Sequence, residues 1–195
     1  MNRGRRICES LHLTALGVWL GAVIMAATAA IIVFPTMKRL DPSLPGFAAY
    51  PKDQWLIAGG QVAARVFWAC DVVQFAGMLV AGATFAAAAW WFGLSVTRVS
   101  TFVRAALLLT LLAVLSYRLG FLEPRMGEAL KNFWAAAQGG DVVAADRFKA
   151  VFDAGHPMQS RLMVGTAIFV LASLVAATWS IATGDTSRAQ DSAHG

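Results

Sequence analysis

The fold of this chain is decided by residues 11–34, LHLTALGVWLGAVIMAATAAIIVF, a stretch with no Asp, Glu, Lys or Arg. A hydrocarbon core about 30 Å thick is crossed by roughly 20 helical residues, at about 1.5 Å each. Three further apolar stretches follow, at residues 72–93, 105–122 and 162–182. We therefore predict an all-α, integral-membrane four-helix bundle that forms a single transmembrane domain over residues 1–195.

Composition and charge exclude a nucleic-acid-binding protein. The 195 residues are 58% hydrophobic and only 14% charged, with a formal net charge of +5. The basic residues do not form one stripe but lie at the ends of the apolar stretches, which is the pattern of a membrane protein. We predict the lipid bilayer as the main partner. A protein partner or a second copy of the chain are further candidates.

The distribution of Lys and Arg predicts the orientation. Residues 1–10, 94–104 and 183–195 hold six of them in 34 positions, whereas residues 35–71 and 123–161 hold nine in 76. Positive charge is concentrated on the cytoplasmic side of membrane proteins. We therefore expect both termini to be cytoplasmic, in what we interpret as a bacterial inner membrane.

The two long outer segments predict an outer cap of short amphipathic helices. Around residues 128–137 and 146–153, apolar side chains recur on one helical face and charged ones on the other. The first outer segment carries three prolines before Trp55, so we expect an irregular stretch followed by a helix that runs into the second span.

Polar groups at the outer helix ends are the main functional candidates, because such groups are costly in a bilayer without partners. We predict that they line a vestibule that binds a small ligand, a lipid or a protein partner without catalysis. The vestibule residues are Asp71, Gln74, Arg118, Glu123, His156 and Arg161.

Three of these residues also have a structural interpretation. Arg118 could extend its guanidinium to the interface, or pair with Asp71 or Glu123 and join two helices. Asp71 could be an ordinary interfacial carboxylate. His156, between Gly155 and Pro157, could be a loop histidine in a turn before the last span.

His12 suggests an alternative function. It lies one turn into the first span, where it could bond a nearby carbonyl or serve as an axial ligand of haem. In the second case the protein would be a membrane redox protein, with haem as its cofactor. We predict no metal site and no catalytic residues, because the sequence has no HExxH motif, nucleophile elbow or phosphate-binding glycine loop.

The stretch Leu11–Met37, in which a histidine leads a Trp-x-Gly helix that ends Phe-Pro, resembles the start of the transmembrane protein 205-like family (domain of unknown function 4149). Pro124-Arg125-Met126 and His156, with Ser160 soon after it, are similar to the family's second half. The resemblance implies four spans and a fold rather than an activity. The same opening also resembles copper resistance protein D and the membrane protoporphyrinogen oxidases, which implies haem or copper, although those families carry more helical histidines.

Two further functions remain open on the sequence. A small-solute or ion transporter would need an oligomer or a very small substrate, since no span is interrupted by an internal Pro or an unwound Gly pair. The second is an accessory subunit of a membrane complex.

Small residues predict close helix contacts, with Gly17 and Gly21 inside the bundle and Gly77 on the second span.

Overall fold

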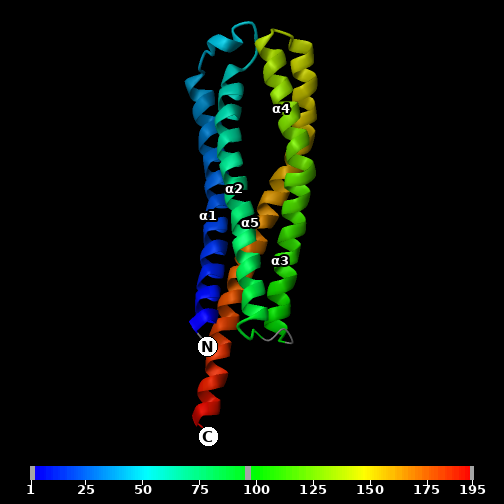
Figure 1. Ribbon diagram of the computed structural model, residues 1–195. Coiled ribbons are helices and arrows are strands. Elements are labelled where there is room, and N and C mark those ends of the chain that lie inside the picture. The colour runs from blue at the N-terminus through cyan, green and yellow to red at the C-terminus, as the bar shows by residue number, and fades with distance from the viewer. Residues whose placement is uncertain (1–2, 95–97, 194–195) are drawn as a thin grey trace. The chain divides into compact units, whose positions relative to one another are not determined.

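The computed structural model describes residues 3–94 and 98–193, and these ranges contain helices and no strand (Figure 1). The helical elements are α1 (Arg3–Leu40), η1 (Pro45–Phe47), α2 (Gln54–Trp90), α3 (Val99–Tyr117), η2 (Arg118–Leu122), α4 (Glu123–Gln138) and α5 (Val142–Ala193). The segment η2 is a π-helical turn, so α3, η2 and α4 follow one another without a loop.

Four helical segments are long and apolar enough to cross a membrane, which confirms the all-α prediction. They are Arg3–Leu40, Gln54–Trp90, Val99–Gln138 and Val142–Ala182. Each extends beyond the apolar stretch that predicted it, because polar residues at the flanks continue the helix. The irregular stretch before α2 is also confirmed, with only the short η1 inside it.

The predicted cap of separate short helices needs correction. Residues 128–137 are indeed helical, in α4, but residues 146–153 are simply the first part of α5, which continues to Ala193. The expected turn at Gly155–Pro157 is therefore absent. Pro157 lies inside α5 with its side chain exposed. Proline has no N–H to donate to the carbonyl of the preceding turn, but its exposed ring does not press against another helix.

The chain divides into two compact units, each made of pieces of several helices. Unit 1 comprises Met1–Ala22, Val73–Val114 and Gly165–Gly195, and unit 2 comprises Val23–Val72 and Leu115–Val164.

In unit 1 the buried side chains repeat at intervals of three and four residues, which is the spacing of one helix face. On α1 this face carries Glu9, His12, Leu16 and Trp19. The helices approach closely at Gly77, where an added Cβ would lie 3.2 Å from the Trp19 Cβ. The prediction for Gly17 and Gly21 is wrong, since both are exposed and nothing lies within 4 Å of the position of their Cβ.

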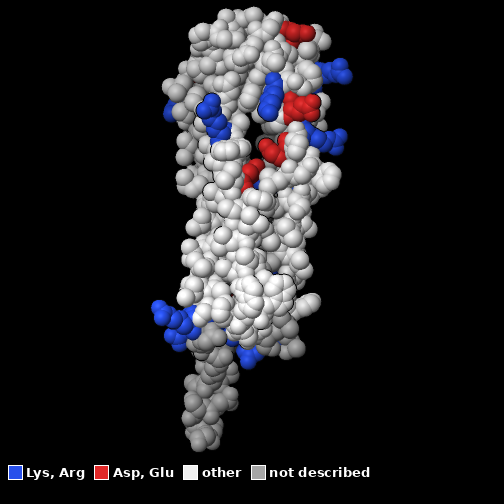
Figure 2. Space-filling model, in the orientation of Figure 1, with Lys and Arg blue, Asp and Glu red and all other residues white. Residues whose placement is uncertain are grey.

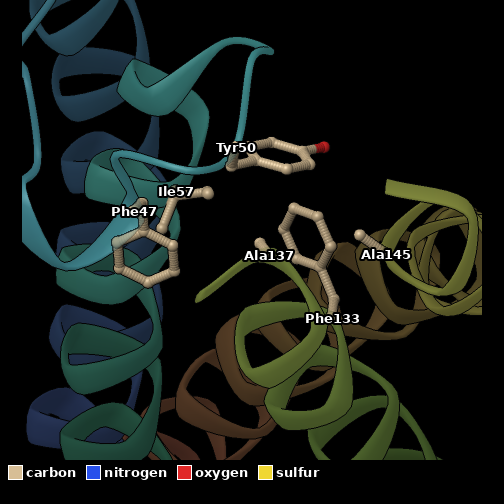
Figure 3. Packing of buried hydrophobic residues seen from close by; sticks show 6 residues of the cluster. All are labelled: Phe47, Tyr50, Ile57, Phe133, Ala137 and Ala145. Atoms are coloured by element: carbon tan, nitrogen blue, oxygen red, sulfur yellow. The ribbon is translucent and has the colours of Figure 1, made fainter. Parts of the chain in front are cut away.

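In unit 2 an apolar cluster joins the loop before α2 to α4 and α5 (Figure 3). Its buried members are Phe47, Tyr50, Ile57, Phe133, Ala137 and Ala145. The rings of Tyr50 and Phe133 meet edge to face with centroids 6.1 Å apart, a favoured aromatic geometry. This cluster packs the loop before α2 and the start of α2 against α4 and α5.

Candidate functional site

Arg118 and Asp71 form an ion pair inside unit 2. Nη2 of Arg118 donates to Oδ1 of Asp71 over 2.5 Å; the Arg118 side chain is completely buried, and 13% of the Asp71 side chain is exposed. The guanidinium therefore points into the protein and links η2 to α2, instead of extending along the surface to an interface.

The π-helical turn brings Glu123 to the same side of the helix as Arg118. In an α-helix, residues five apart are separated by roughly 140° around the axis, at about 100° per residue. In η2 the backbone N–H of Glu123 bonds to the carbonyl of Arg118, so the two residues lie one above the other. Glu123 interacts electrostatically with both Asp71 and Arg118.

Gln159 of α5 completes this group, which we call the unit 2 polar cluster: Asp71, Arg118, Glu123 and Gln159. Nε2 of Gln159 donates to Oε2 of Glu123 over 3.0 Å. Within the described part of the chain, three buried atoms of the cluster have no hydrogen-bond partner: Nε and Nη1 of Arg118, and Oε1 of Gln159. The cluster carries two carboxylates and one guanidinium, so its formal charge is negative. Figure 2 shows a hollow in the face of unit 2, with acidic side chains at its rim.

The other predicted vestibule residues are exposed on α5 or belong to unit 1. His156 is exposed on α5 and stacks on Phe152, with ring centroids 5.7 Å apart. Arg161 is also exposed on α5. Gln74 belongs to unit 1, where it is buried and its Oε1 accepts a 3.2 Å hydrogen bond from Nε1 of Trp19.

Unit 1 contains a second buried charge group, centred on Glu9 of α1 and Arg104 of α3. Nη1 and Nη2 of Arg104 donate to the two carboxylate oxygens of Glu9 at 3.1 and 2.7 Å, with both side chains at most 2% exposed. Arg5 adds a weaker contact to Glu9 at 3.9 Å, and the Arg104 guanidinium lies 5.4 Å from the centroid of the Phe85 ring. A bidentate pair of this kind fixes the register of two helices.

Sequence reasoning missed this pair because it measured apolar stretches instead of helix faces. Glu9 precedes the first stretch by two residues and Arg104 precedes the third by one. Helix periodicity would have indicated the pair, because residues three or four apart share one face of a helix. Glu9 lies three residues before the buried His12, and Arg104 lies four residues before the buried Leu108. Gln159 gave no comparable signal, because the sequence indicated a loop there.

His12 is enclosed by the helices of unit 1. Its side chain is 1% exposed, its Nδ1 lies 3.0 Å from the carbonyl oxygen of Ala81, and its ring lies 6.3 Å from that of Phe85. An axial ligand must present its other ring nitrogen to a space wide enough for a porphyrin. The packing around His12 does not fit haem.

In the loop before α2, Lys52 forms an ion pair at 2.5 Å with Asp146 of α5, and this hydrogen bond raises the pKa of Lys52. Burial, followed by the negative charge of Asp146, raises the pKa of Tyr50. These contacts fasten the loop before α2 to α5 and stay in place at neutral pH.

No group of three or more His, Cys, Asp or Glu side chains suited to a metal ion occurs among the described residues.

Comparison with protein-family models, curated proteins and solved structures finds no match to this chain. The resemblance of Leu11–Met37 to the transmembrane protein 205-like family stays a prediction, and the function has to be argued from the two buried charge groups.

Proposed function

We propose that the chain is an integral protein of a bacterial inner membrane, with four spans and both termini in the cytoplasm. The outward faces of its helices support insertion, since large apolar side chains such as Ile31, Trp68 and Leu109 are 66–74% exposed. Such surfaces are stable against lipid and are a liability in water. The orientation follows from the higher density of Lys and Arg near the termini.

We propose further that the protein binds a small polar ligand at the unit 2 polar cluster, without catalysis. The observation that carries this function is Arg118, a completely buried guanidinium that has two nitrogens without a partner among the described residues. Buried donors without partners are rare and costly in native proteins, and an ion or ligand is a common explanation.

The first test is native mass spectrometry of the protein extracted in mild detergent. We expect a small molecule or lipid to remain bound to the wild type and to be lost from Arg118→Lys. Lysine keeps a positive charge near Asp71 but lacks the planar set of donors that a guanidinium offers. The ligand is identified by its mass after dissociation.

The matched control is Arg147→Lys, which makes the same change at an exposed position on α5. It should retain the ligand to the same extent as the wild type. Thermal unfolding of all three proteins establishes that they are folded. A folded Arg118→Lys protein that keeps every bound molecule would refute the proposed site.

The haem alternative has a separate spectroscopic test. Because His12 is enclosed, we expect the purified protein to show no Soret band, either oxidised or reduced. A stoichiometric Soret band that disappears in His12→Ala would contradict this expectation and make the protein a redox protein.

A further inference from the structure

We propose that the ligand of the unit 2 polar cluster is a zwitterion that carries a primary ammonium and an anionic oxygen, the chemistry of a phosphoethanolamine group. This inference rests on the proposed function and specifies its ligand class. The buried atoms of the cluster without a partner among the described residues are of two kinds, donors on Arg118 and an acceptor on Gln159, and a zwitterion carries the groups complementary to both.

The donors select an anionic oxygen. Arg118 uses only Nη2 in its hydrogen bond to Asp71, which leaves Nε and Nη1 without partners in the part of the chain that is described. A guanidinium has five N–H bonds and no acceptor, so these nitrogens can be satisfied only by an acceptor. Phosphate and carboxylate oxygens match this geometry well.

The acceptors select a cation that can donate hydrogen bonds. Oε1 of Gln159 has no partner in the described structure, and the amide of the same side chain is bonded to the Glu123 carboxylate. The cluster also has more carboxylates than cationic groups. A primary ammonium offers three N–H donors and one positive charge, and so suits both features. A trimethylammonium group has the charge but no donor.

The position of the cluster along the helices agrees with a lipid headgroup. Asp71 lies 19 residues before Trp90, the last residue of α2, and Arg118 lies 19 residues after Val99, the first residue of α3. At about 1.5 Å per residue both distances are about 29 Å, close to the thickness of the hydrocarbon core. The same zwitterionic group also occurs in soluble molecules, and the experiment must separate the two sources.

The experiment titrates the full chain in detergent with phosphatidylethanolamine, phosphatidylglycerol and phosphatidylcholine of identical acyl chains, and counts bound lipids by native mass spectrometry. We expect the ethanolamine lipid to bind about tenfold to a hundredfold more tightly than the other two, the effect of hydrogen bonds to a charged group. Soluble phosphoethanolamine is added as a competitor. Competition at equal affinity assigns the site to a soluble zwitterion, and its failure assigns the site to the lipid; both outcomes support the proposed chemistry.

Glu123→Gln tests the ammonium contact by a change of preference that unfolding cannot imitate. We expect this variant to lose its preference for the ethanolamine lipid and to bind phosphatidylglycerol more tightly than the wild type does, because one negative charge is gone. Glu128→Gln, an exposed position on α4, should behave as the wild type.

The two proposals fail in different ways. If all three lipids bind equally, and Arg118→Lys weakens all of them, the zwitterion is wrong and the binding site stands. If Arg118→Lys changes the binding of no lipid and of no soluble zwitterion, the binding function itself is overturned.

Discussion

Arg104→Met is expected to lower the free energy of unfolding by about 3–5 kcal/mol, the usual cost of removing one partner of a buried ion pair. The change leaves the Glu9 carboxylate, only 2% exposed, without the two hydrogen bonds that it accepts from Arg104. Methionine fills much of the same volume, so the loss reports the missing guanidinium of Arg104 more than a cavity. Thermal and denaturant unfolding in detergent measure it.

The control is Lys149→Met, which breaks an exposed ion pair with Asp153 within α5 and should cost only about 0.5 kcal/mol. The double variant Arg104→Met with Glu9→Leu removes both charges and should recover most of the loss. If Arg104→Met is no less stable than Lys149→Met, the Glu9–Arg104 pair does not hold unit 1 together.

Asp71→Leu is expected to cost about 3 kcal/mol, the lower end of the same range, because Asp71 keeps 13% of its side chain exposed. It leaves the completely buried Arg118 guanidinium without its carboxylate. Adding Arg118→Leu should restore most of the stability. The double variant should not bind the ligand of the unit 2 polar cluster, since the guanidinium is then absent. Unfolding and the lipid titration are measured on the same samples.

The comparison for this second change is Asp153→Leu, at an exposed carboxylate of α5, which should cost less than about 1 kcal/mol. A double variant that is no more stable than Asp71→Leu alone would show that the cost comes from the shape of leucine at this position. The Asp71–Arg118 pair would then contribute little to unit 2.

The length of the apolar stretches was sufficient to predict the four long helices, because a stretch such as residues 11–34 leaves few alternatives to a helix. It also selected Arg118, since a charged residue within an apolar stretch needs a partner, and Asp71, which borders the second stretch. It did not predict where helices end. A turn was predicted at Gly155–Pro157, yet a single proline with an exposed ring is tolerated inside a long helix.

Spacing along the sequence alone could not predict which residues make up the unit 2 polar cluster. Glu123 and Arg118 share one side only because of the π-helical turn, which has no sequence signature that we could have used. Gln159 contributes through the continuation of α5 across Pro157. His156 was a better candidate by chemistry than Gln159, but the helix turns it outward, against Phe152.

The order of charges along the chain bears on how the protein is made. Arg104 lies in α3 and Arg118 in the π-helical turn that follows it, both buried, and a charged side chain without a partner is costly in a bilayer. Their carboxylates, Glu9 and Asp71, stand earlier in the sequence. Since synthesis runs from the N-terminus, the membrane insertion that we propose would bring both acids to the bilayer before the arginines, so that the third span enters beside helices that already offer neutralising partners.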